Sequence, residues 1–141
     1  MIRAVIDTNV LVSGLLSPAG NEALIILAIH HGMLLPCFSD EILVEYATVL
    51  ARPKFNFPPD EIAELLAMLR SKGGLFAPVV LSAIVSPDQT DTKFLQCAQA
   101  AQAEFIVTGN KRDFPASPYG PTRVVNATEL LDRITSETIR K

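Results

Sequence analysis

Residues 1–9, MIRAVIDTN, decide the fold of this chain. The run Met1–Ile6 is apolar apart from Arg3, and it ends abruptly at the polar group Asp7-Thr8-Asn9. A short apolar run without alternation is typical of a strand that is buried on both faces. Polar side chains directly after such a strand lie at the edge of the sheet where α/β proteins bind their ligands. We therefore expect Asp7 to lie at the functional edge of a central sheet.

Strand and helix signals alternate along the rest of the chain. Further strands are predicted at residues 34–38, 75–85, 105–108 and 123–125, and helices at about residues 17–32, 39–50, 58–73, 91–101 and 126–134. This alternation favours right-handed βαβ units and a mostly parallel sheet that is covered on both faces. The sequence thus predicts one three-layer α/β domain over residues 1–141, with a sheet of four or five strands flanked by helices.

Capping residues mark two of the predicted helix starts. Ser39 precedes Asp40 and Glu41, and acids in a first turn complement the helix dipole. Asn126 is followed three residues later by Glu129, which is typical of a capping box. Both helices are therefore expected to begin at these residues.

Composition excludes several classes of protein. The chain has 141 residues, 49% of them hydrophobic, which suffices for one core and excludes a disordered or fibrous protein. The formal net charge of −3 provides no overall positive field for nonspecific binding of nucleic acid. Cys37 and Cys97 are too few for a disulfide framework or a zinc site. No signal-peptide core or apolar run near ~18 residues is present, so we expect a cytoplasmic protein that does not enter a membrane.

Four acidic residues are expected to meet at one edge of the sheet. Asp7 follows the first predicted strand, and Asp113 lies just after the fourth. Asp91 opens the helix before that strand, and Glu45 lies beside the apolar stripe of its own helix. Carboxylates brought this close repel one another unless they share a cation. Oxygen ligands of this kind select Mg²⁺ or Mn²⁺, and such an ion can activate water for attack on a phosphodiester.

Each acid taken singly has an ordinary structural explanation. Asp7 and Asp91 could each cap a helix, and Asp113 could be a turn residue. Glu45 alone is most simply a partly solvated helix residue. The hypothesis of a metal site therefore rests on the four residues together.

Four segments of the chain resemble a known family. They are Val5–Leu11 (VIDTNVL), Ser39–Glu45 (SDEILVE), Asp91–Leu95 (DTKFL) and Ile106–Phe114 (IVTGNKRDF). In this order and spacing they resemble the signature segments of PIN domains, and most closely those of bacterial and archaeal toxins of the VapC group. The resemblance spans nearly the whole chain and implies a three-layer PIN-like fold.

The resemblance also implies a function. PIN domains place acidic residues around Mg²⁺ or Mn²⁺ and cleave RNA, so it implies a metal-dependent endoribonuclease. Asp7, Glu45 and Asp91 occupy the three best-preserved acidic positions. Thr8, Asn9 and Thr108 would be supporting groups that orient the carboxylates or a metal-bound water.

The fourth acidic position departs from the usual pattern. Asn110 stands where many PIN domains carry an Asp after Thr-Gly, while other toxin-like members have Asn there and an acid three residues later. That acid is Asp113, which we assign as the fourth catalytic and metal-binding residue. Lys111 and Arg112 could contact substrate phosphates, although a solvated charged loop is the more frequent explanation.

The family implies partners as well as an activity. Its members commonly form homodimers, and many bind a small antitoxin protein. Two alternatives to an RNA-cleaving toxin stay open. Asn110 keeps open a catalytically degenerate fold that binds RNA or protein, and an Asp after the first strand also suits a doubly wound phosphatase. The phosphatase is disfavoured because Asn9 stands where its nucleophile loop carries a second Asp.

Overall fold

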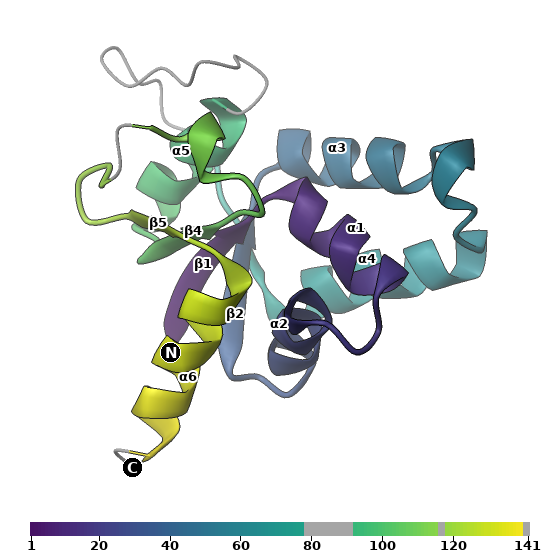
Figure 1. The fold of residues 1–141 in the computed structure, drawn as a ribbon. Helices are drawn as coiled ribbons and strands as arrows, with labels where there is room; N and C mark the ends of the chain where they lie inside the picture. The colour runs from purple at the N-terminus through teal and green to yellow at the C-terminus, as the bar shows by residue number, and fades with distance from the viewer. Residues whose placement is uncertain (78–91, 116–117, 140–141) are drawn as a thin grey trace.

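Five parallel strands form the centre of the fold in the residues that the structure describes (Figure 1). The structure is a computed structural model that describes residues 1–77, 92–115 and 118–139. The strands are β1 (Ile2–Ile6), β2 (Leu34–Phe38), β3 (Gly74–Leu75), β4 (Phe105–Val107) and β5 (Arg123–Val125). Their order is β3-β2-β1-β4-β5, so the strand order reverses between β1 and β4. Ligands of such sheets bind beyond the carboxyl ends of the strands at this reversal.

Helices cover both faces of the sheet, as expected. They are α1 (Thr8–Leu16), α2 (Asn21–His30), α3 (Asp40–Leu50), α4 (Pro59–Lys72), α5 (Thr92–Ala101) and α6 (Ala127–Ile139), with short 3-10 turns η1 (Pro53–Phe55) and η3 (Lys111–Asp113). Figure 1 shows α1 to α4 gathered on one side of the sheet and α5 on the other. α5 contacts β1, β2 and β4, and α6 packs against α2. The predicted single α/β domain with three layers is confirmed.

Both predicted caps are present. The Ser39 hydroxyl oxygen accepts a hydrogen bond from the Ile42 amide at the start of α3. At the start of α6, the Asn126 side chain accepts from the Glu129 amide at 2.8 Å, and the Glu129 carboxylate accepts from the Asn126 amide at 3.0 Å. These exchanges satisfy amide groups that the first turn of a helix leaves without a partner.

One helix was not expected from the sequence. The chain passes from β1 into α1 with Asp7 as the N-cap residue, so no loop separates strand from helix. The β-branched residues and the glycine of α1 have low helix propensity, which hid the element from pattern analysis. The two helices pack closely at Gly14, because a Cβ there would lie 2.5 Å from Cδ1 at the end of the Ile26 side chain and 3.2 Å from the Glu22 carbonyl oxygen of α2. Tertiary contact therefore stabilises α1 where local preference does not.

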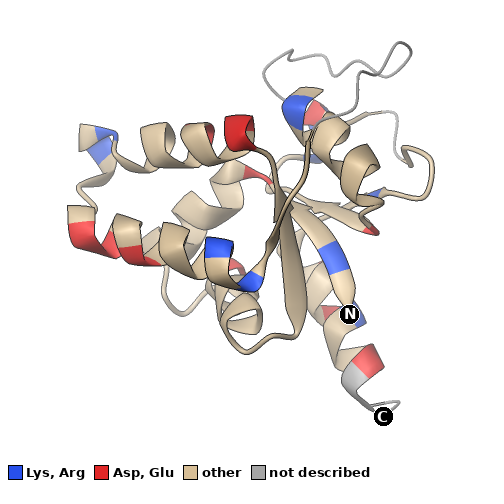
Figure 2. Ribbon diagram, turned by 180° about the vertical axis from the view of Figure 1, so that it is seen from behind, with Lys and Arg blue, Asp and Glu red and all other residues tan. Residues whose placement is uncertain are grey.

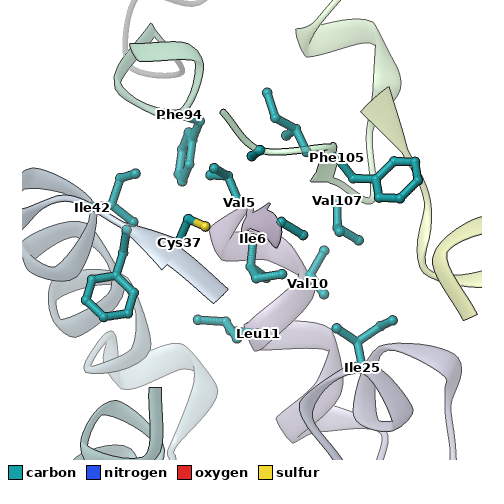
Figure 3. Close-up of a cluster of buried hydrophobic side chains, with 14 of the residues drawn as sticks. Val5, Ile6, Val10, Leu11, Ile25, Cys37, Ile42, Phe94, Phe105 and Val107 are labelled. Atoms are coloured by element: carbon teal, nitrogen blue, oxygen red, sulfur yellow. The ribbon is translucent and has the colours of Figure 1, made fainter. Parts of the chain in front are cut away.

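The core occupies both faces of β1. Successive residues of a strand point to opposite faces, and Val5 and Ile6 are both almost completely buried. Figure 3 shows Phe94 of α5 on the side of Val5, and Leu11 of α1 on the side of Ile6. This burial on both sides explains why β1 is apolar without alternation. It also fixes the position of Asp7, the residue that follows the strand.

Part of the prediction lies outside the described residues. The strand expected at 75–85 corresponds to β3 at its start, and residues 78–85 are not described. Asp91 also lies outside the described residues. Among the described helices, none is long and apolar enough by itself to cross a membrane, although α1 and α2 together reach that length with a bend of 104° between them.

Candidate active site

Asp7 is the most buried of the candidate-site acids that the structure describes. Its relative exposure is 5%, and its backbone amide donates to the Val107 carbonyl of the neighbouring strand β4 at 2.9 Å. Directly after β4, the buried Thr108 hydroxyl donates to Oδ2 of Asp7 at 2.7 Å. The ends of β1 and β4 therefore meet, and Asp7 lies at the reversal of strand order.

Glu45 reaches the same edge from α3. The Thr8 hydroxyl donates a hydrogen bond to Oε2 of Glu45. The Lys93 ammonium lies 2.8 Å from the other carboxylate oxygen, Oε1. The helix itself is held against β1, because the buried Tyr46 hydroxyl donates to the Ile6 carbonyl. One side chain of α3 thus anchors the helix, and the adjacent one belongs to the acidic cluster.

The loop after β4 adds amides and a further acid. Oδ1 of Asn9 accepts from the Gly109 amide at 3.0 Å, which joins the start of α1 to this loop. Oδ1 of Asn110 accepts from the Arg112 amide at 3.2 Å, and its Nδ2 donates to Oδ1 of Asp113 at 3.4 Å. Asn110 therefore stabilises the η3 turn and contacts the neighbouring acid.

The electrostatics of Asp7 link three of the four predicted acids. The pKa of Asp7 is raised from 3.8 to about 6, chiefly by burial and to a smaller extent by the negative charges of Glu45 and Asp113. The hydrogen bonds from Thr108 and from the Thr8 backbone act in the opposite direction and lower the pKa. Asp7 is thus a desolvated carboxylate that two other carboxylates repel, and a cation beside it would relieve both penalties.

The described residues do not by themselves form a complete metal-binding group. Among residues 1–77, 92–115 and 118–139, no set of three His, Cys, Asp or Glu side chains is arranged to hold a metal ion. Asp91, the remaining predicted acid, is outside these ranges. The Glu45 carboxylate is held by the Lys93 ammonium and the Thr8 hydroxyl, and these two contacts set its orientation. The oxygen donors of Asp7, Glu45 and Asp113 nevertheless have the chemistry that Mg²⁺ and Mn²⁺ prefer.

Lys111 and Arg112, the two residues predicted to contact phosphates, differ in their surroundings. The Lys111 ammonium lies 2.5 Å from a carboxylate oxygen of Glu129 in α6, and both side chains are about half exposed. This contact lowers the pKa of Glu129. Arg112 is exposed on the η3 turn. Figure 2 shows the Lys and Arg residues distributed over several elements of the described chain.

Lys93 belongs to this site, although its role was not expected from the sequence. Its side chain is only 13% exposed and pairs with Glu45. A usable signal was present, because Lys93 lies two residues after Asp91 and next to the buried Phe94 at the start of a helix. A lysine that folding largely buries is normally paired, so this position should have been expected to face an acid.

Comparison with known proteins identifies the family. Residues 3–112 match a family model that is described as a PIN domain. The matched span contains Asp7, Glu45 and Asp91 and ends one residue before Asp113. No curated protein is a significant match to the chain. PIN domains are generally nucleases and typically use divalent metal ions. Since the match covers most of its length, the chain belongs to the PIN domain family.

Proposed function

We propose that this protein is an endoribonuclease that depends on Mg²⁺ or Mn²⁺ and cleaves RNA phosphodiester bonds. The observation that carries this proposal is the environment of Asp7, a buried carboxylate at the reversal of strand order with two further carboxylates close enough to raise its pKa. Such a cluster is costly to a folded protein. The cost is understandable if the acids hold a cation during function.

Asp7, Glu45 and Asp113 would hold the ion, together with Asp91 if its side chain reaches the same edge. When bound, the ion supplies positive charge that stabilises the developing charge on the phosphodiester and acidifies an attacking water. Thr108 keeps Oδ2 of Asp7 in place through its hydrogen bond. Thr8 does the same for Oε2 of Glu45. These two hydroxyl groups orient carboxylates without adding charge.

Residues after β4 would contact the RNA backbone. Asn9 and Gly109 fix the start of this loop through their hydrogen bond. Arg112 is exposed one residue before Asp113, and its guanidinium group would contact a phosphate that a bound cation draws to this edge. Lys111 would have to exchange Glu129 for the phosphate.

The biological role that we propose is that of a cytoplasmic toxin with a small antitoxin partner, as the likeness to VapC proteins implies. We also propose a homodimer. The large exposed side chains Leu24 and Leu27 lie three residues apart on α2 and are 45% and 48% exposed. Residues at this spacing share one face of a helix, and an exposed apolar face is typical of an interface.

A second candidate is a noncatalytic PIN fold that binds RNA or protein. The observation that favours it is Asn110, whose side chain is engaged with the Arg112 amide and Asp113 at a position where many relatives have an acid. A noncatalytic fold would show no saturable binding of Mn²⁺ and no cleavage under any metal condition.

The deciding experiment is cleavage of a mixed RNA pool by the purified protein with Mn²⁺, with Mg²⁺ and with chelator. Asp7→Asn should abolish cleavage, because it removes the central charge while it preserves side-chain size. The matched control is Asp132→Asn, which makes the same change at an exposed site on α6 and should cleave like the parent. An Asp7→Asn protein that cleaves as fast as the parent would overturn the assignment.

A further inference from the structure

Lys93 occupies an electrostatically unfavourable position that the proposed chemistry does not explain. It is the second residue of α5, and a cation in the first turn of a helix opposes the positive end of the helix dipole. Its side chain is also only 13% exposed, so the ammonium has lost much of its hydration. Two separate penalties at one residue call for a compensating interaction.

Glu45 provides that compensation, and it is one of the acids of the site. The Lys93 ammonium contacts Oε1 of Glu45 at 2.8 Å, while the Thr8 hydroxyl donates to Oε2. Both oxygens of this carboxylate are therefore engaged by residues of the chain itself. A divalent cation that binds Glu45 must therefore displace one of these contacts or share a carboxylate oxygen with it, close to the Lys93 ammonium.

We propose that Lys93 is a resident counter-ion of the acidic site, which competes with the divalent cation for Glu45 and thereby sets the metal concentration at which the site fills. This inference rests on the proposed function, since it concerns the metal that the same acids would hold. The Thr8 hydroxyl is uncharged and leaves the negative charge of Glu45 available to a cation, whereas Lys93 places a positive charge directly beside the carboxylate. Lys93 is thus a positioning residue that acts through Glu45.

The competition has a direct energetic consequence. Like charges within a few ångströms of each other at a partly buried site interact strongly. Binding of a divalent cation must either displace the ammonium from Glu45 or occur against its repulsion, and both lower the affinity for the metal. A neutral side chain of similar length would remove the competitor and leave the carboxylates in place.

The test is the affinity for Mn²⁺ of chelator-treated protein, measured by calorimetry and by the electron paramagnetic resonance signal of free Mn²⁺. Lys93→Met and Lys93→Gln should each bind Mn²⁺ at least about fivefold more tightly than the parent. Lys93→Arg retains the charge and should bind within about twofold of the parent. Two neutral variants are used so that a folding defect in one does not decide the result, and melting in chelator verifies the fold of each.

The matched control is Lys72→Met. Lys72 is an exposed residue at the end of α4, just before β3, and therefore at the opposite edge of the sheet from the acids. This variant has the same change in net charge as Lys93→Met and should bind Mn²⁺ like the parent. An equal gain in both lysine variants would mean that net charge alone is responsible, and would overturn the inference.

The outcomes separate this inference from the proposed function. If Asp7→Asn abolishes Mn²⁺ binding while Lys93→Met binds no more tightly than the parent, the metal site stands and the counter-ion role is wrong. If neither the parent nor any Lys93 variant binds Mn²⁺, the proposed metal-dependent nuclease is itself overturned, and the counter-ion role with it. Tighter binding in both neutral variants, lost again when Asp7→Asn is added, supports both.

Discussion

At the scale of single residues, Asp7 lowers the stability of the metal-free protein. Its pKa is raised from 3.8 to about 6 on folding, chiefly by burial. The folded state therefore holds this proton more tightly than the unfolded state, and stability falls as the pH rises from about 4 to about 6. We expect Asp7→Asn, in chelator, to raise the free energy of unfolding at pH 7 by about 1 to 3 kcal/mol.

Urea unfolding of both proteins between pH 3.5 and 8 measures this difference. Because the penalty disappears once Asp7 is protonated in the folded state, the gain in the variant should shrink as the pH falls from about 6 to about 4 and be absent below about pH 4. Asp132→Asn, at an exposed position, should stay within about 0.5 kcal/mol of the parent. A variant that is less stable than the parent at pH 7, or a gain that does not change with pH, would contradict this account of Asp7.

Thr108 lowers the pKa of Asp7, whereas burial raises it. Its hydroxyl donates to Oδ2 of Asp7 at 2.7 Å, and this bond lowers the pKa of Asp7. Thr108→Val removes the donor and keeps the shape, so the pKa of Asp7 should rise. If cleavage requires ionised Asp7, the acidic limb of its pH profile should move to higher pH. Thr108→Ser keeps a hydroxyl donor, so the acidic limb of its pH profile should lie at the same pH as in the parent. An acidic limb that does not move in Thr108→Val would show that this hydrogen bond does not control the ionisation of Asp7.

At the scale of elements, Tyr46 fixes the position of α3 relative to β1. Its fully buried hydroxyl donates to the Ile6 carbonyl, one residue before Asp7. Tyr46→Phe leaves this carbonyl without its donor, and we expect it to cost about 1 to 2 kcal/mol of unfolding free energy. Thr48→Val is a suitable control, because the Thr48 hydroxyl bonds only within α3 at an exposed position, and it should be nearly neutral. Equal losses in the two variants would show that α3 is not anchored through Tyr46.

The elements that carry local signals could be predicted from the sequence. Ser39 and Asn126 mark helix starts with side-chain caps, and the structure contains both. α1 could not be predicted, because its β-branched residues and glycine have low helix propensity, and its close packing against α2 at Gly14 is not visible in local preference. The approach of Asp7 to Thr108 follows from the parallel pairing of β1 and β4 and could be predicted.

The pairing of side chains within the site was harder to predict than its location. The sequence predicted that four acids would gather at the edge of the sheet, and three of them, Asp7, Glu45 and Asp113, are close enough for their charges to interact. The fourth, Asp91, lies outside the described residues. The sequence did not indicate that Lys93 would pair with Glu45. That contact joins α5 to α3, and no spacing along the chain encodes the distance between two helices from different layers.

At the scale of the whole molecule, the exposed leucines of α2 predict self-association. Leu24 and Leu27 are each nearly half exposed, and Leu16 at the end of the neighbouring helix α1 is 54% exposed. A stable dimer buries about 800 Å² on each partner, and a cluster of large apolar side chains is the usual centre of such an interface. We therefore expect a dimer in solution, with α2 of each copy near the twofold axis.

Light scattering after size exclusion measures this directly. The double variant Leu24→Glu, Leu27→Glu introduces like charges that would face each other across a symmetric interface, so it should elute as a folded monomer. Val44→Glu is the matched control, because Val44 is a 65% exposed apolar residue on α3 and its replacement should leave the dimer intact. A parent protein that remains monomeric at about 100 μM, well above the Kd of an interface of standard size, would contradict the proposed homodimer. A dimer that persists in the double variant would place the interface away from α2.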